Sequence, residues 1–420
     1  MYEVGYFYQN IWTSAEDIKS GKVSVYNENF FRNLSAYRLV WNLTQDGKVV
    51  QQGTVDNLDI EPQQSKIVTL NGLTINGLEG ELLLNISYVL KEAEPLMDKG
   101  QTVAYNQINV REYDYPQLTF FKKGGKIKIK DKDDITTVTG KNFIIAFDKI
   151  TGLITDYRVN DYDVLYDDGT IRPNFWRAVT DNDMAACLQQ RFADWYNPEM
   201  NLTYYKVEQN KKLNNAVITT GFDLPLLKSR LNITYTIEGD GTVTINERLF
   251  AVQDIAVPGM FRFGMIIEMP ESSDISEYYG RGPIENYADR KSSQNIGIYR
   301  QTADEQVFSY IRPQESGTKS DMRWWKQTDA EGNGVIITSN RSFYASASQY
   351  SIDDLDDGME KDQRHTEQID KCGYTNLLLD LEHYGVGGID SWSSHAEALP
   401  QYRVNYGDKS FTFRITPINK

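Results

Sequence analysis

Histidines and carboxylates are the side chains of this sequence whose types could carry catalytic chemistry. His365, His383 and His395 do not stand in the spacing of a metal-ligand set, so the sequence predicts no zinc site. It also contains no Gly-x-Ser-x-Gly elbow, no phosphate-binding glycine loop and no dinucleotide fingerprint. These absences argue against a serine hydrolase of the elbow type and against a nucleotide-dependent enzyme.

Two Asn-Glu pairs, Asn27-Glu28 and Asn246-Glu247, are the places where a glycosidase-type acid would be sought. Retaining glycoside hydrolysis needs two carboxyl groups about 5 Å apart, one as nucleophile and one as acid. Both pairs lie in or beside alternating strand patterns, and no alternation of strands and helices surrounds them to form a barrel. We therefore interpret them as exposed polar positions on strands, and the sequence nominates no catalytic pair.

The acidic clusters and the cysteines receive structural interpretations. The clusters Asp131 to Asp134 and Asp353 to Asp357 lack the ligand order of an EF-hand, so we expect solvated turns. Cys187 and Cys372 lie far apart and form no Cys-x-x-Cys pattern. We expect two unpaired, mostly buried thiols, with a single disulfide as the open alternative.

Composition indicates ordered, sheet-rich protein of two or three domains. The chain has 420 residues, 12% aromatic residues and a net charge of -15. Aromatic rings suit pleated sheets and stack on sugars, whereas an acidic surface repels phosphate backbones, so we expect no nucleic-acid partner. No apolar run is long enough to cross a bilayer, and Met1 to Val4 does not begin a signal peptide. We therefore expect no membrane partner.

Strand signals predict an immunoglobulin-like sandwich over residues 1–113. Polar and apolar residues alternate in Lys22 to Tyr26 and again in Tyr37 to Leu43. Asp46-Gly47 then indicates a hairpin turn. With the later runs there are about seven short strands, the number of such a sandwich. The pattern breaks between residues 113 and 125, where we place the domain boundary.

Residues 125–420 are expected to form a second, large antiparallel sandwich. Asp148 to Gly152 separates two alternating runs as a hairpin, and sheet patterning continues to Phe411 to Thr416. The segment 183–196 has the one helical pattern in this region. The predicted fold class is thus all-β throughout.

Five motifs, in one order, carry a resemblance to a known family. Tyr278 to Arg290 contains Gly-Pro-Ile-Glu-Asn-Tyr-Ala-Asp-Arg, which is similar to a signature of the C-terminal domain of large beta-galactosidases of glycoside hydrolase family 2. Residues 1–112 resemble the sandwich that precedes this domain, and Val179 departs from the family's usual proline. The other similar segments are Phe143 to Gly152, Asn174 to Asp183, Arg312 to Gly317 and Gly385 to Ser393.

The resemblance implies a supersandwich, similar in fold to galactose mutarotases, whose loops complete an active-site cleft. It assigns Trp392 to the subsite of the leaving sugar, with Asp390 and Ser391 as further substrate-binding candidates. Gly387 and Gly388 would then permit unusual backbone angles in a projecting loop. The alternative is that Trp392 packs under its own loop.

Eight polar residues of the motifs are candidates for a network that maintains the fold or contacts the barrel, rather than the sugar. We expect His383 to be structural and the pair Trp324-Trp325 to belong to the core. The candidates are Arg177, Asp181, Asn182, Asp183, Glu285, Asn286, Asp289 and Arg290.

The resemblance further implies that this chain is the non-catalytic part of a retaining beta-galactosidase, inactive alone. Two Glu of a barrel domain outside this chain would catalyse the hydrolysis. Mg and Na ions are expected in that barrel, and this segment is expected to need no cofactor. The expected partners are a galactoside substrate and the catalytic barrel. The expected location is the bacterial cytoplasm or periplasm. Met1 is interpreted as a start within the linker that follows the barrel. The glycosidic linkage of the substrate and the oligomeric state are not predicted, and a homo-oligomer is one possibility. A free-standing carbohydrate-binding module and an epimerase are the alternatives.

Overall fold

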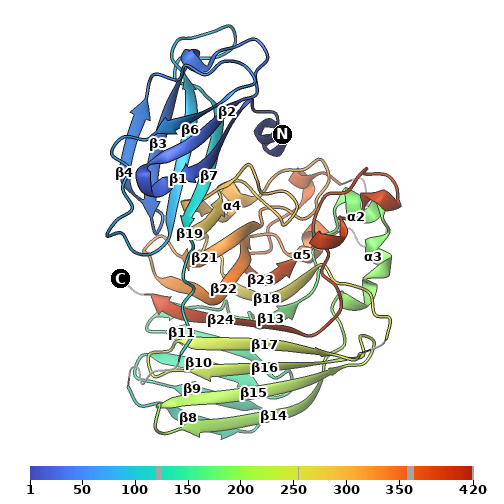
Figure 1. The fold of residues 1–420 in the computed structure, drawn as a ribbon. Helices are drawn as coiled ribbons and strands as arrows, with labels where there is room; N and C mark the ends of the chain where they lie inside the picture. Colours follow the sequence, from blue (N-terminus) through green and yellow to red (C-terminus); the bar gives the residue numbers. More distant parts are fainter. Residues whose placement is uncertain (120–124, 254, 357–363, 419–420) are drawn as a thin grey trace. The chain divides into compact units, whose positions relative to one another are not determined.

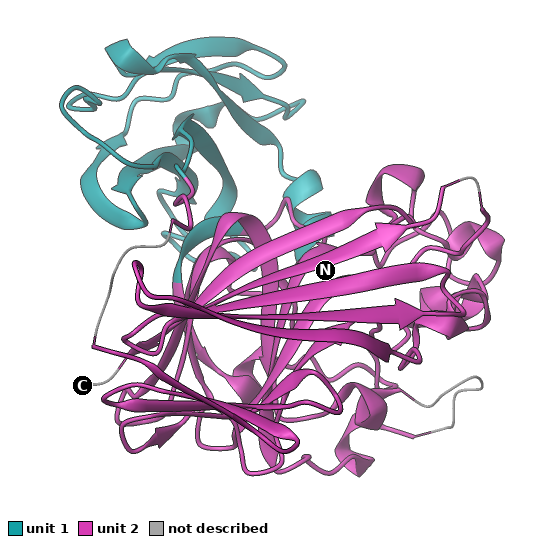
Figure 2. Cartoon of the chain, turned by 90° about the horizontal axis from the view of Figure 1, so that it is seen from below, with its two compact units in different colours: residues 1–114, 295–298 teal, residues 115–294, 299–420 magenta. Residues whose placement is uncertain are grey.

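The computed structural model consists mainly of strands and divides into two compact units (Figure 2). Unit 1 comprises residues 1–114 and 295–298, and unit 2 comprises 115–294 and 299–420. The prediction of an all-β fold is confirmed. The structure describes residues 1–119, 125–253, 255–356 and 364–418, so part of the predicted boundary region lies outside the described residues.

Unit 1 contains seven strands in two antiparallel sheets around one core, as expected for the immunoglobulin-like sandwich (Figure 1). One sheet has the order β1-β2-β5 and the other β4-β3-β6-β7. A short helix, α1 (Tyr2–Phe7), precedes them. The strands are β1 (Ile11–Asp17), β2 (Lys22–Asn27), β3 (Tyr37–Gln45), β4 (Lys48–Val55), β5 (Ser65–Thr69), β6 (Leu82–Leu90) and β7 (Thr102–Arg111).

The β3–β4 hairpin shows why this sequence forms a sandwich. Asp46 and Gly47 have φ values of 48° and 80°, which Asp and Gly tolerate in a tight hairpin turn. Alternation along β3 buries Trp41 to 1% exposure. A Cβ at Gly53 on the paired strand would lie 2.8 Å from the indole, so glycine there makes room for the largest core side chain.

Unit 2 is built on a closed antiparallel arrangement of strands, and the prediction of a large antiparallel fold is confirmed (Figure 1). Its strands are β8 (Lys128–Lys132), β9 (Ile135–Thr139), β10 (Phe143–Asp148), β11 (Leu153–Val159), β12 (Tyr162–Asp163), β13 (Ile171–Asn174), β14 (Asn201–Asn210), β15 (Asn215–Leu224), β16 (Ser229–Ile237), β17 (Val243–Ala251), β18 (Arg262–Pro270), β19 (Ile275–Gly282), β20 (Asn295–Thr302), β21 (Lys319–Thr328), β22 (Gly334–Ser348), β23 (Tyr374–His383) and β24 (Lys409–Ile418). The first residues of β20 belong to unit 1.

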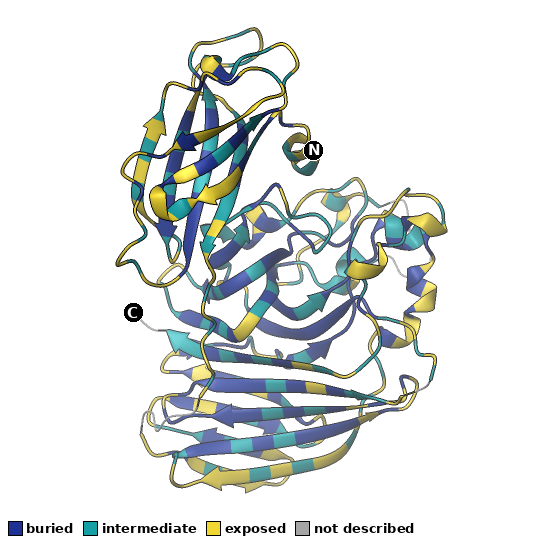
Figure 3. Cartoon of the chain, in the orientation of Figure 1, coloured by how far each residue is buried: buried dark blue, intermediate teal, exposed yellow. Residues whose placement is uncertain are grey.

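The strands around the core of unit 2 are mostly buried or half-buried (Figure 3). Strand β18 pairs with β13 and β23 and is buried almost along its whole length, so its sequence is largely apolar apart from the buried Arg262 and Glu268. Trp325 is fully buried and stacks on Tyr278 at 4.7 Å between ring centroids, whereas Trp324 is half-buried. The core prediction is thus confirmed for Trp325.

The prediction of one continuous helix over residues 183–196 is wrong. The segment forms α2 (Asp181–Ala185), α3 (Leu188–Arg191) and a 3-10 turn at Ala193–Trp195. Cys187 separates the two helices because its φ of 56° is left-handed. Two further helices, α4 (Ala303–Gln306) and α5 (Ile352–Leu355), were not predicted, since each is one turn closed by a capping box.

Two other predictions need correction. Both thiols are free, but Cys187 is exposed and Cys372 is half-buried, because the left-handed turn directs Cys187 outward. The second acidic cluster is not a solvated turn: Asp354 caps α5, and Asp356 accepts the Trp176 indole N–H at 2.7 Å. Asp357 lies outside the described residues. The first cluster, Asp131 to Asp134, is exposed as predicted.

No helix among the described residues has the length and apolar character needed to cross a membrane.

Candidate functional site

The segment after β23, here called the Trp392 loop (residues 385–396), presents an exposed indole. Trp392 is 80% exposed, and of the seven tryptophans it alone has an exposed side chain. Ile389 on the same loop is 78% exposed. The interpretation in which Trp392 packs under its own loop is therefore wrong: the ring stands free to contact another molecule.

The glycines of this loop serve close packing rather than unusual backbone angles. Gly387 and Gly388 do not adopt a positive φ, so the expectation from sequence is wrong on this point. A Cβ at Gly388 would overlap the carbonyl oxygen of Ala396, and one at Gly385 would lie 2.5 Å from a carboxylate oxygen of Asp289. The loop folds back on itself at a distance that only glycine allows.

Asp289 contacts the beginning of the Trp392 loop. Its carboxylate accepts hydrogen bonds from the backbone N–H groups of Val386 at 3.1 Å and Gly387 at 2.8 Å. Tyr287 and Arg290 exchange backbone hydrogen bonds of 3.1 and 3.0 Å, which close a tight turn that carries Asp289. The Gly-Pro-x-Glu-Asn-Tyr-x-Asp-Arg motif thus reaches the loop through its aspartate.

Asn182 contacts the second half of the loop. Its side-chain amide donates to the carbonyl oxygens of Asp390 and Ala396, each at 3.2 Å. The neighbouring Asp181 instead meets Gln314, whose amide donates to the Asp181 carboxylate at 3.2 Å. Two adjacent residues at the start of α2 therefore hold two different loops.

The other two substrate-binding candidates differ in their surroundings. The Asp390 carboxylate accepts from the N–H groups of Trp392 at 3.2 Å and Ser393 at 3.1 Å, and from the Ser393 hydroxyl at 2.7 Å. These bonds, with the Ser393 hydroxyl first, hold the pKa of Asp390 below its ordinary value. Ser391 is exposed beside Trp392.

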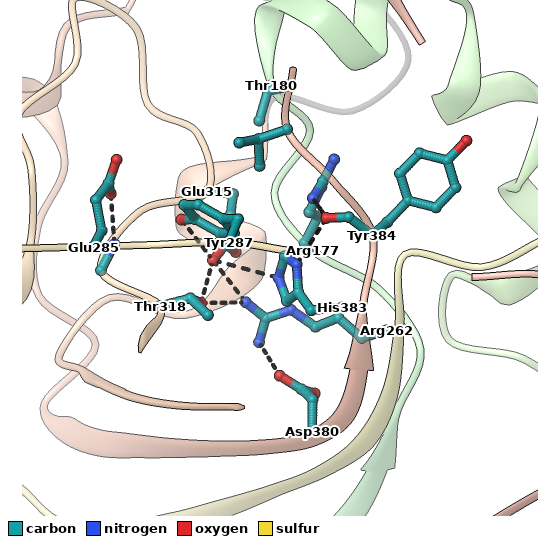
Figure 4. A network of polar contacts seen from close by, with 12 residues as sticks. Arg177, Thr180, Arg262, Glu285, Tyr287, Glu315, Thr318, Asp380, His383 and Tyr384 are labelled. Carbon is teal, nitrogen blue, oxygen red and sulfur yellow. Dashed lines mark hydrogen bonds and ion pairs between the residues drawn. The ribbon is translucent and has the colours of Figure 1, made fainter. Parts of the chain in front are cut away.

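Arg177, which Figure 4 shows, forms a buried ion pair with Asp183 at the entry of the Trp392 loop. Arg177 is fully buried and donates to the two Asp183 oxygens at 3.1 and 2.7 Å. It also donates to the carbonyl oxygens of Tyr384 at 2.6 Å and Gly385 at 2.9 Å. Asp183 in turn caps α2 through Thr180. The guanidinium therefore joins the start of α2 to the entry of the Trp392 loop.

The remaining motif candidates lie in neighbouring turns. Glu285 accepts from Arg290, and at 2.8 Å from the N–H of Gly317. Asn286 is buried, and its oxygen accepts from the N–H and hydroxyl of Ser320 at 2.9 and 2.6 Å. These side chains bond to protein groups, at Gly317 just before β21 and at Ser320 near the start of that strand.

A second buried cluster was missed by sequence reasoning (Figure 4). Arg262 is 1% exposed, and its Nη2 lies 2.7 Å from Glu315 while its Nη1 lies 3.3 Å from Asp380. His383 lies 3.7 Å from the same Glu315 oxygen and is buried, as expected for a structural histidine. Arg262 and Asp380 belong to paired strands, β18 and β23, and stand in none of the motifs, so no sequence signal joined them.

Burial and the Arg262 cation are the main causes of the pKa shifts in this cluster. Burial opposes the charge of Glu315, but Arg262 and His383 hold its pKa well below its ordinary value. Burial raises the pKa of Asp380 to about 7 despite Arg262, and lowers that of His383 to about 4. At neutral pH the histidine is uncharged, Glu315 is ionised against Arg262, and Asp380 is near the midpoint of its titration. All of these groups are buried, so none of them can exchange a proton with a sugar.

We expect removal of the Arg177 cation to destabilise unit 2 strongly, because Asp183 would stay buried without a partner. Arg177→Met should lower the free energy of unfolding by about 3–5 kcal/mol. Arg191→Met is a matched control, since the Arg191–Glu397 pair is half-exposed on the arginine side and should cost about 0–1 kcal/mol. Urea unfolding followed by circular dichroism measures both. Equal losses in the two variants would contradict the assigned role.

The interpretation of the Asn-Glu pairs as exposed positions is wrong for two of their members. Asn27 is buried and donates to the carbonyl oxygens of Arg32 and Ile60 at 2.8 and 2.9 Å. Glu247 is fully buried, because alternation along β17 places it on the same face as Ile245. Neither of its carboxylate oxygens has a hydrogen-bond partner.

Glu247 and Asp380 are thus two buried acids that interact electrostatically within the core. Burial first, and the Asp380 charge second, raise the pKa of Glu247 well above its ordinary value. A carboxyl group without hydrogen-bond partners in an apolar core is stable only when protonated. The pair has raised pKa values like a catalytic acid, yet it lies in the core and has no access to a substrate.

We expect the stability of unit 2 to fall as the pH rises from about 4 through 7, because both acids are protonated preferentially in the folded state. Glu247→Gln should weaken this pH dependence and stabilise the protein at pH 8 by about 1–3 kcal/mol. Denaturant unfolding at pH 5, 6.5 and 8 measures it. Glu208→Gln removes the same charge from an exposed position and should have no such effect. Parallel pH profiles for the wild type and Glu247→Gln would refute this expectation.

Metal-ligating side chains do not gather in the described part of the chain: no three His, Cys, Asp or Glu residues there could hold one ion.

Comparisons with known proteins match the chain to two protein families and to relatives that are longer than this chain. Residues 139–415 match the family described as beta galactosidase small chain, and residues 23–111 match beta-galactosidase, domain 4. A beta-galactosidase of Priestia megaterium is 29% identical over 99% of this chain and 39% of its own length. A beta-galactosidase of Lactobacillus delbrueckii subsp. bulgaricus is 30% identical over 90% of this chain and 36% of its own.

The chain therefore spans about two fifths of the length of these relatives. Among solved structures, a galactose 1-epimerase from Lactobacillus acidophilus aligns with a TM-score of 0.40 and 7% identity, over 70% of this chain and 98% of the epimerase.

Proposed function

Because the chain belongs to the beta galactosidase small chain family, with a beta-galactosidase domain 4 before it, we propose that it completes the sugar-binding cleft of a retaining beta-galactosidase. The catalytic carboxylates would belong to the part of the enzyme that this chain does not span. The substrate would be a terminal beta-galactoside. The observation that carries the proposal is the free indole of Trp392, 80% exposed on a loop held by motif residues.

The Trp392 loop supports a sugar contact through its shape and rigidity. An indole offers a wide, apolar face and costs little conformational entropy when it binds, which suits the C–H face of a pyranose. Ile389 beside it is also exposed, so two large apolar side chains face solvent on one short loop. Exposed apolar groups on an ordered loop are typical of a surface that another molecule covers.

The buried acids support the placement of the chemistry outside this chain. Glu247, Asp380 and Glu315 combine perturbed pKa values with burial, and none is open to a sugar. His383, the histidine that lies near one of these carboxylates, is sealed in the same cluster, which argues against the epimerase alternative. The function of this chain would therefore be to shape a binding cleft and to support the catalytic barrel.

We expect Trp392→Ala in the intact enzyme to weaken binding of the leaving or acceptor sugar by about 2–10-fold, the equivalent of about 0.5–1.5 kcal/mol of aromatic contact. The Michaelis constant for lactose should rise and transglycosylation onto added glucose should fall. Ile150→Ala is the matched control, because it removes an exposed isoleucine from the turn between β10 and β11, which is not part of the Trp392 loop, and it should leave transglycosylation unchanged. Unchanged transglycosylation in Trp392→Ala would refute the assigned contact.

The chain alone should not hydrolyse nitrophenyl beta-galactoside, because its buried acids cannot reach a substrate. A turnover assay on protein purified from a host that lacks beta-galactosidase measures this, and activity above the level of the host extract would refute the proposal. Calorimetric titration with galactose and lactose tests the alternative that the chain is a carbohydrate-binding module. We expect no saturable heat, whereas the exposed Trp392 of a binding module would give it.

A further inference from the structure

We propose that Asn182 and Asp289 are positioning residues, which fix the two halves of the Trp392 loop and so set the place of the indole against the sugar. The inference rests on the proposed function of Trp392. It assigns to two polar motif residues an effect on sugar affinity, although neither is required to touch the sugar.

The Asp289 contact fixes the beginning of the loop. One carboxylate accepts two successive backbone N–H groups, at Val386 and Gly387, so it orients the peptide plane between them. The same carboxylate lies against Gly385, where a Cβ would approach it to 2.5 Å. Gly385, Val386 and Gly387 therefore all pack against the Asp289 side chain.

The Asn182 contact fixes the second half. Its amide donates to the carbonyl oxygens of both Asp390 and Ala396, which draws the two sides of the turn together. The Asp390 carboxylate then accepts the N–H of Trp392 itself. Asn182 is thus connected to the indole-bearing residue through one intervening amino acid.

Burial separates these two residues from the ones that maintain the fold. Asn182 and Asp289 are half-buried at the edge of unit 2, whereas Arg177 and Asp183 are fully buried. Val386, Gly387 and Asp390 are half-buried or exposed, so water can replace the contacts made to them, whereas the Ala396 carbonyl that Asn182 also bonds belongs to a buried residue. Loss of either contact should therefore change the loop and leave the core intact.

The test uses two near-isosteric variants and a charge-matched control. Asn182→Asp replaces the amide donors by oxygens that face two carbonyls, and Asp289→Asn removes the charge and one acceptor. Asn210→Asp is the control, because Asn210 acts only as an acceptor, for the N–H groups of Lys212 and Leu213, and an aspartate keeps that role. We expect Asn210→Asp to unfold within about 0.5 kcal/mol of the wild type, and the two loop variants to lose about 1–2 kcal/mol, less than the loss of about 3–5 kcal/mol expected for Arg177→Met.

The first measurement reports on the loop without any sugar. Hydrogen exchange of residues 385–396 should become at least about tenfold faster in Asn182→Asp and Asp289→Asn, and unchanged in the control. Acrylamide quenching of tryptophan fluorescence should change in parallel, since Trp392 is the one exposed tryptophan in the described part of the chain. Wild-type exchange in both variants would overturn the inference.

The second measurement connects the loop to sugar affinity in the intact enzyme. Transglycosylation onto glucose should fall about 2–10-fold in both variants, as expected for Trp392→Ala, while kcat for nitrophenyl galactoside stays within about twofold. In the Trp392→Ala background, Asn182→Asp should have no further effect, because a residue that acts through Trp392 has nothing left to position.

The outcomes distinguish this inference from the function on which it rests. If Trp392→Ala weakens acceptor binding while Asn182→Asp and Asp289→Asn do not, the positioning role is refuted and the sugar contact stands. If Trp392→Ala itself has no effect, the proposed function fails, and the positioning role for a sugar subsite fails with it. A full additional loss from Asn182→Asp in the Trp392→Ala background would show an effect by another route, and would also overturn the inference.

Discussion

A single buried guanidinium connects the parts of unit 2 that matter for the proposed function. Arg177 has no access to water, so its charge and its donors must be satisfied by protein groups. Asp183 supplies the charge, and the carbonyl oxygens of Tyr384 and Gly385 accept the other donors. Because all of these groups must contact Arg177, the start of α2 and the end of β23 lie close together. The Trp392 loop begins there, and its geometry depends on this pair.

The sequence was sufficient to predict the strands, because alternation and turn residues are local signals. The hairpin at Asp46-Gly47 and the β10–β11 hairpin lie where turn chemistry placed them. The helix over 183–196 could not be predicted correctly, since one left-handed residue, Cys187, divides it. Glu247 was misassigned for a different reason: its position in the alternation was visible, but a charged residue type was taken to imply exposure.

For the candidate site, the sequence predicted the residues that belong to motifs but not the contacts that these residues make. The motifs identified Arg177, Asn182 and Asp289, yet which groups they bond depends on segments about 100 to 200 residues away in the chain. The cluster around Arg262 joins strands and loops whose sequences contain no signal for one another. Backbone carbonyls and N–H groups are partners in most of these contacts, and a sequence shows nothing of where they point.

Steric limits at the glycines divide the Trp392 loop into two kinds of position. At Gly385 and Gly388 a side chain would collide with Asp289 or with Ala396, so these positions tolerate no larger residue without opening the loop. At Ile389, Ser391 and Trp392 the side chains face solvent and contribute little to the fold. Under the proposed function, substitutions at these outward positions would change the contact with the sugar while the backbone of the loop stays as it is.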